Sequence, residues 1–253
     1  MPEPRESAPV TVTFAGSGDA FGSGGRLQAC IHVAAAGVPP VLLDCGATSL
    51  PALKRLGLDP GEIRTVFVSH LHGDHFGGLP FLILDGQFAR RATPLTVVGP
   101  PGTADRLAAT MEALFPGSSG VRRRFTTDVV ELAPGGTATA GAATVRAWAA
   151  DHASGAPALS LRLAYAGRTI AYTGDTAWTD GLPAAADGAD LLIAEAYYRH
   201  KPIPYHLRVA DLAAHRADLA ARRTIVTHMS ADVLDHPADL PYESAYDGMV
   251  VGV

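Results

Sequence analysis

The chain has 253 residues, 47% of them hydrophobic, which is enough to bury a substantial core. No apolar run approaches the roughly 20 residues needed to cross a bilayer, and residues 1–9 lack the apolar segment of a signal peptide. The 20 basic residues are outnumbered by 25 acidic ones, which argues against a surface for long nucleic acids. We therefore expect a cytoplasmic protein folded as one domain over residues 1–253, with residues 1–9 as a flexible tail.

The first part of the chain alternates predicted strands and loops. An alternating strand at residues 10–15 runs into a glycine-rich loop at 16–22, and a second strand follows at 28–34. No helix follows this loop to hold a phosphate, so we interpret the loop as a turn between antiparallel strands. A third strand, 41–46, ends in Asp44-Cys45-Gly46. Cys30 and Cys45 lack C-x-x-C spacing, and we expect them to be reduced rather than paired in a disulfide.

The stretch around residue 70 concentrates metal-binding side chains. An apolar strand is predicted at 63–68 and a helix at 76–88, with the sequence H-x-H-x-D-H between them. Alternate residues of an extended chain point the same way, so His70 and His72 can bind one ion together. Asp74 and His75, at the start of the helix, could then serve a second ion. Imidazole and carboxylate groups are suitable zinc ligands.

The second part repeats the pattern of strands that end in polar residues. Strands are predicted at 143–149, 158–165, 169–172, 191–194 and 224–227, and a helix at 209–221. His152, Asp175 and His228 each follow one of these apolar runs. Residues at strand ends emerge at a sheet edge, where loops carry chemistry. The three side chains are therefore candidates for the same metal site.

These motifs resemble those of the metallo-β-lactamase fold superfamily, whose H-x-H-x-D-H signature is matched here without a substitution. The resemblance extends over about residues 10–236. The resemblance implies an α/β (α+β) fold, a four-layer αββα sandwich. It also implies two Zn²⁺ ions, with manganese or iron as alternatives, that share a hydroxide as the nucleophile. The implied ligands are His70, His72 and His152 for the first ion, Asp74, His75 and His228 for the second, and Asp175 for both. Asp74 could also orient the water, and Asp44 is expected to orient ligand histidines.

Within the superfamily, the sequence motifs are most similar to those of the RNase Z-like and phosphodiesterase-like subgroup. That subgroup has an E-A segment followed by a histidine, and here Glu195-Ala196 precedes His206. The resemblance implies that Glu195 and His206 form a catalytic dyad that protonates the leaving alkoxide. The alternative is that Glu195 only ends a strand and His206 only begins a helix.

A small phosphodiester, such as a cyclic nucleotide, is the expected substrate. Enzymes that process tRNA 3′ ends usually carry a long arm between the third histidine and the bridging aspartate, but His152 and Asp175 are only 23 positions apart. Hydrolysis of a lactone, ester or thioester by the same site is the main alternative. A further alternative is that the protein binds metal without catalysing a reaction. The basic run at 122–124 is interpreted as a solvated loop, with a phosphate-facing patch as the alternative. A homodimer is compatible with the resemblance, and no membrane partner is expected.

Overall fold

The computed structural model describes residues 9–253, so the predicted tail, except Pro9, lies outside the described part. Within these residues, fourteen strands form two seven-stranded sheets. The first sheet has the order β14-β1-β2-β3-β4-β5-β6, made of Met249–Gly252, Val10–Gly16, Cys30–Ala35, Val38–Leu43, Thr65–Phe67, Leu95–Gly99 and Thr127–Glu131. The second has the order β13-β12-β11-β10-β9-β8-β7, made of Glu243–Ser244, Thr224–Thr227, Leu191–Glu195, Arg168–Tyr172, Ala158–Tyr165, Ala143–Ala150 and Thr137–Ala140.

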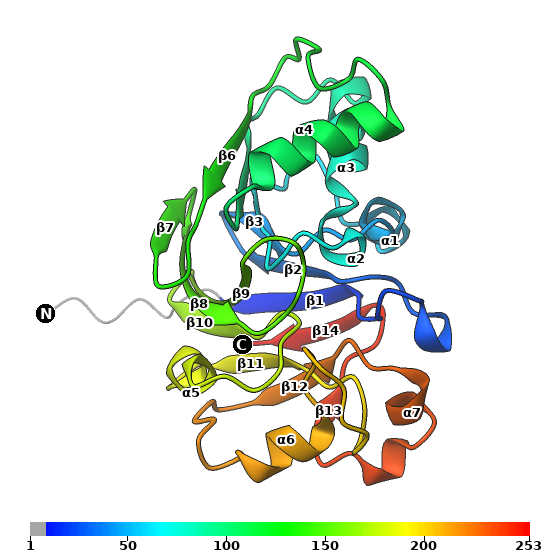
Figure 1. Ribbon diagram of the computed structural model, residues 1–253. Helices are drawn as coiled ribbons and strands as arrows, with labels where there is room; N and C mark the ends of the chain where they lie inside the picture. The colour runs from blue at the N-terminus through cyan, green and yellow to red at the C-terminus, as the bar shows by residue number, and fades with distance from the viewer. Residues whose placement is uncertain (1–8) are drawn as a thin grey trace, which may run out of the picture.

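Helices cover the outer faces of the two sheets (Figure 1). On the first sheet lie α1 (Ser49–Arg55), α2 (Gly73–Phe76), α3 (Leu79–Phe88) and α4 (Thr103–Leu114). On the second lie α5 (Gly181–Ala186), α6 (Val209–Ala214) and α7 (Ala231–Leu234). The short 3-10 turns are η1 (Ser23–Gly25) and η2 (Pro237–Asp239). The predicted αββα sandwich is confirmed.

Alternation along the strands explains the four layers, since successive side chains point to opposite faces of a sheet. In β3, Val41 and Leu43 pack in the core between the sheets, whereas Leu42 packs under the helices of the first sheet. In β11, Ile193 faces the central core and Leu192 faces α5 and α6. All of these side chains are buried. Three apolar cores, one between the sheets and one under each set of helices, therefore hold the four layers of secondary structure together.

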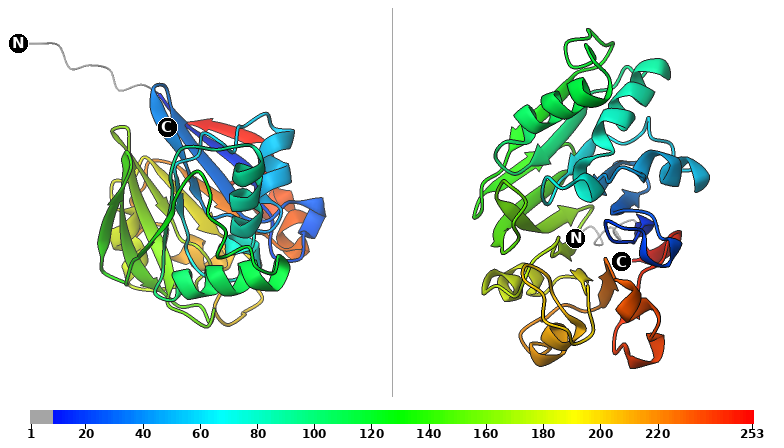
Figure 2. Two further views of the ribbon diagram at one scale, coloured as in Figure 1. Left: turned by 90° about the horizontal axis from the view of Figure 1, so that it is seen from above. Right: turned by 45° about the vertical axis from the view of Figure 1, so that its right-hand side comes forward.

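Strand direction decides where polar residues gather. In the first sheet β3, β4, β5 and β6 run parallel, and in the second sheet β10, β11, β12 and β13 run parallel. The carboxyl ends of neighbouring parallel strands meet at one edge of a sheet, which is where ligands bind in such folds. The last strand, β14, pairs antiparallel with the first, β1, and forms one edge of the first sheet (Figure 2).

Most predicted elements are confirmed, including the antiparallel pairing of β1 and β2 around the glycine-rich loop. The prediction of one helix at 76–88 was wrong in one respect. The chain forms two helices, α2 and α3, which are separated at Gly77 and Gly78. A Cβ on Gly78 would lie 2.2 Å from the carbonyl oxygen of Gly46, so the chain needs glycine to pass there. The strand expected at 63–68 is shorter, Thr65–Phe67.

The helix expected at 209–221 was also too long, since α6 ends at Ala214. The next residue, His215, lies with its ring stacked 3.7 Å from Trp178 and its Nδ1 2.9 Å from the Asp218 carboxylate, and the chain turns there. Cys30 and Cys45 are free and buried, as predicted. Among residues 9–253, no helix has the length and apolarity to cross a membrane. The single domain and the cytoplasmic location stay predictions.

Candidate metal centre

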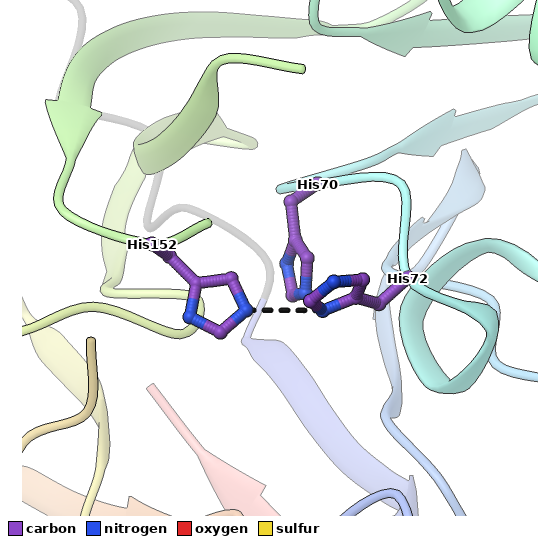
Figure 3. Close-up of side chains that lie close together, drawn as sticks. All are labelled: His70, His72 and His152. Atoms are coloured by element: carbon purple, nitrogen blue, oxygen red, sulfur yellow. Dashed lines mark hydrogen bonds between the residues drawn. The ribbon is translucent and has the colours of Figure 1, made fainter. Parts of the chain in front are cut away.

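Three histidine rings converge from two parts of the chain (Figure 3). His70 follows β4, His72 precedes α2 and His152 follows β8. The ring centroids are 4.7 to 4.9 Å apart in all three pairs, with the rings close to perpendicular. Nε2 of His152 lies 3.0 Å from Nδ1 of His72. Nitrogen atoms of three imidazoles thus face one small space, as the ligands of one metal ion do.

A second group of ligand atoms adjoins the first. Nε2 of His75 lies 3.3 Å from Oδ2 of Asp74 and 3.2 Å from Oδ1 of Asp175. Nε2 of His228 lies 3.2 Å from Oδ2 of Asp74 and 3.5 Å from Oδ2 of Asp175. His228 follows β12 and adopts a left-handed backbone conformation, with φ of 55°. The four side chains are buried and come from both sheets.

Asp175 connects the two groups. Its Oδ2 atom is 3.9 Å from Nε2 of His70 and 4.0 Å from Nε2 of His152, both of the first group. Its Oδ1 atom faces His75 of the second group. The carboxylate follows β10 and is 3% exposed, so water cannot screen it. Such a position between two ligand sets is what a carboxylate shared by two cations requires.

The donor atoms fit a metal because several of them have no other partner. Within residues 9–253, Nε2 of His70, Nε2 of His75 and Oδ1 of Asp175 are buried and make no hydrogen bond. Leaving buried polar atoms unpaired costs free energy, which ion binding would recover. Burial alone would lower the pKa of His75, but the carboxylates of Asp175, Asp74 and Asp44 outweigh burial and hold that pKa well above its usual range. The acidic cluster therefore favours positive charge at this point.

Asp44, directly after β3, orients His75. Its Oδ2 atom accepts hydrogen bonds from Nδ1 of His75 at 2.7 Å, the hydroxyl of Tyr172 at 2.8 Å and the hydroxyl of Ser69 at 2.8 Å. Its Oδ1 atom accepts from the backbone N–H of Ser69 at 2.7 Å. Because Nδ1 donates this bond, the neutral imidazole of His75 has its lone pair on Nε2, which is directed at the cluster and can bind a cation there.

Glu195, the last residue of β11, holds His206 beside the same cluster. Its Oε1 atom accepts from Nδ1 of His206, and its Oε2 atom accepts from the backbone N–H groups of Thr176 and Leu207, at 3.0 and 3.1 Å. Nδ1 of His206 lies 3.9 Å from Oδ2 of Asp175. Burial raises the pKa of Glu195, and the charge of Asp175 adds to this, so the pair can retain a proton. The two residues of the predicted dyad are therefore in contact.

Comparison with known proteins agrees with this geometry. Residues 40–229 match the family model described as the beta-lactamase superfamily domain. The chain belongs to the metallo-β-lactamase superfamily. It is thus a metal-dependent hydrolase of that family.

Among relatives in this superfamily, ribonuclease Z of Mycobacterium avium (strain 104) is 28% identical over 240 residues, which cover 87% of this chain and 85% of the relative. Human tRNase Z, short form, is a solved structure of 27% identity with a TM-score of 0.77, covering 95% of this chain and 98% of that one. A diphosphatase from the PhnP family has the same TM-score at 21% identity, with 97% of both chains covered, and shows the shared fold.

Some contacts of the metallo-β-lactamase site were not predicted. The carbonyl oxygen of Ser17, in the glycine-rich loop, accepts a hydrogen bond from the backbone N–H of His228 at 3.1 Å. Asp247, near the C-terminus, accepts from the N–H and hydroxyl of Ser17 and from the N–H of Leu27. The carbonyl oxygen of Tyr205 accepts from Nδ1 of His152. No local pattern marks these partners, because each bond joins distant parts of the chain.

Other candidates lie outside the cluster. His32 is buried within β2 and belongs to none of the groups of possible metal ligands among residues 9–253. In the basic run, Arg123 donates to the carbonyl oxygens of Ser118 and Val121 and braces its own loop. Arg122 and Arg124 are exposed. This arrangement supports the interpretation of residues 122–124 as a solvated loop.

Proposed function

We propose that the protein hydrolyses a phosphodiester with two zinc ions held by the seven clustered side chains. The first ion would be held by His70, His72 and His152, the second by Asp74, His75 and His228, and both by Asp175. Divalent ions there would polarise a phosphoryl oxygen and lower the pKa of a water molecule, which is the chemistry that attack on phosphorus needs. Mn²⁺ or iron would fit the same nitrogen and oxygen donors.

The observation that carries the proposal is the contact of His206 with Glu195 at the edge of the cluster. Because the carboxylate of Glu195 holds Nδ1 of His206, the imidazolium form of His206 can give the proton on its other ring nitrogen, Nε2, to a departing oxygen. The side chain of His206 is 19% exposed, so a substrate can reach it. A phosphodiester with an alkoxide leaving group needs such a donor, since an alkoxide is a poor leaving group without a proton.

The connection between His152 and Asp175 supports a compact substrate. It consists of the hairpin β9–β10 with short segments at either end, and it contains no inserted arm. A small molecule such as a nucleoside cyclic phosphate would reach the cluster without an extended binding surface. The relatives named ribonuclease Z favour a second candidate, cleavage of precursor tRNA. These two substrates share the bond to be cleaved and differ in size.

The test compares leaving groups. His206→Ala should lower kcat on a nucleoside 2′,3′-cyclic phosphate by about 100- to 10,000-fold, the range for loss of a general acid. On bis(p-nitrophenyl) phosphate, whose phenolate leaves readily without a proton, the loss should be much smaller. Bound metal, measured by atomic emission, should not change. His200→Ala, an exposed histidine in the same segment, is the matched control and should behave as wild type.

Three outcomes would change the assignment. An equal loss on both phosphodiesters would remove the acid role from His206. A preference of the wild type for p-nitrophenyl esters or lactones by orders of magnitude would replace phosphodiester hydrolysis by acyl hydrolysis. Rapid cleavage of precursor tRNA, with no turnover of small phosphodiesters, would establish the second candidate instead.

A further inference from the structure

Tyr205 adopts an unusual backbone conformation beside the candidate metal site. Its φ angle is 68°, in the left-handed region that is costly for a bulky residue and favours glycine. Tyr205 is also 45% exposed. A bulky residue that is kept in a strained conformation without being buried points to a role toward a ligand.

The backbone on both sides of Tyr205 is fixed to the candidate site. Its carbonyl oxygen accepts from Nδ1 of His152 at 3.0 Å, so that Nε2 of this histidine faces the cluster without a proton. The next residue, His206, is held by Glu195, and so is the N–H of buried Leu207. The strained residue therefore lies between a candidate metal ligand and the candidate proton donor.

The ring of Tyr205 leaves room for a planar group. Its centroid lies 6.5 Å from that of the His152 ring, at an interplanar angle of 87°. A perpendicular contact of this kind can use at most one face of the tyrosine ring. The contact with His152 therefore leaves the other face of the ring available, and Tyr205 is 45% exposed at the border of the metal cluster, where a group attached to a bound phosphate would lie.

We propose that the ring of Tyr205 is a stacking surface for a planar group, such as a nucleobase, joined to the phosphate that the site binds. The proposal rests on the proposed phosphodiester chemistry and adds the class of substrate. Aromatic rings stack on bases of any identity, so the selection would be for a planar base over an aliphatic substituent and not for one base. The competing role is structural, in which the ring only shields His152 from water.

A binding experiment on the full-length, zinc-loaded protein separates the two roles. Adenosine monophosphate and ribose 5-phosphate share a sugar phosphate and differ in the base. Calorimetry should show tighter binding of adenosine monophosphate by about 5- to 100-fold, the affinity gained from stacking one base on an aromatic side chain. Tyr205→Ala should abolish this ratio of the two affinities, while the affinity for ribose 5-phosphate stays unchanged. Tyr205→Phe and Tyr205→Trp should keep the ratio.

Controls make each outcome informative. Tyr205→Gly removes the ring and relieves the backbone strain, so it should also lose the ratio while its Tm stays at or above that of wild type. Phe88→Ala removes an aromatic ring that is 82% exposed at the end of α3, and it should change neither affinity. An unchanged ratio in Tyr205→Ala, or no preference for adenosine monophosphate in wild type, would overturn the proposal. Loss of zinc from Tyr205→Ala would assign the shielding role.

The binding ratio is independent of turnover. If the phosphodiester chemistry is wrong, the kinetic test on His206→Ala fails while the preference for the base can persist. If only the stacking is wrong, turnover of phosphodiesters persists and the ratio is absent. The two failures are thus distinguished by separate measurements.

Discussion

Substitution of Asp44 by asparagine removes one charge and keeps the shape of the residue. Asn tolerates the left-handed conformation found here, with φ of 60°, so the backbone should not move. The carboxylate accepts four hydrogen bonds from Ser69, His75 and Tyr172, and it is fully buried. An amide has one oxygen, so in its best orientation the N–H of Ser69 faces an NH₂ group and loses its acceptor.

The magnitude follows from that count. A hydrogen bond to a charged group contributes about 1.5–3 kcal/mol, and a buried donor left unpaired costs a similar amount. We expect Asp44→Asn to lower the free energy of unfolding of the metal-free protein by about 2–3 kcal/mol in urea titrations. Because Asp44 orients His75, zinc affinity should fall by about 10- to 100-fold, measured by competition with a chromophoric chelator. The exposed residue Asp128 provides the control, Asp128→Asn. Wild-type stability and zinc affinity in Asp44→Asn would refute this reasoning.

Two further predictions concern residues away from the ligand set. Burial lowers the pKa of His32 from 6.5 to about 4, so the unfolded chain takes up a proton that the folded protein excludes. Stability is therefore lost as pH falls, by about 2 kcal/mol between pH 7 and pH 5, and His32→Leu should remove that part of the loss in urea titrations at the two pH values. Asp247→Ala should lower zinc affinity by about 10-fold in the chelator assay, since it releases the loop that binds the N–H of His228; unchanged affinity would show that the loop is held by other contacts.

Much of the fold could be predicted because local patterns and tertiary structure agree. The strands that carry the cluster are apolar runs that end abruptly in His70, Asp175 or His228, and parallel strands bring such ends together. The errors lie where tertiary contacts override local preference. The apolar helix pattern is divided at Gly77 and Gly78, and the backbone of Gly46 passes too close to Gly78 for any side chain. Nothing in the residues around position 78 indicates that neighbour.

The support around the site was only partly visible in the sequence. Asp44 could be predicted from its place in a turn, whereas its partner Tyr172 looks like an ordinary strand residue. Asp247 and Ser17 are 230 positions apart, and no spacing rule connects them. The strained conformation of Tyr205 depends on contacts with His152 that form only in the folded chain. The ligand residues can therefore be predicted where they cluster in the sequence, whereas the distant residues that orient them cannot.

Diffraction from zinc-loaded crystals at the zinc absorption edge tests the central claim most directly. The account predicts two anomalous peaks within bonding distance of the seven side chains. One would lie among His70, His72 and His152, the other among Asp74, His75 and His228, with Asp175 touching both. Asp175→Ala should lose zinc and activity together. A single ion, or ions bound elsewhere on the protein with full activity, would contradict the account.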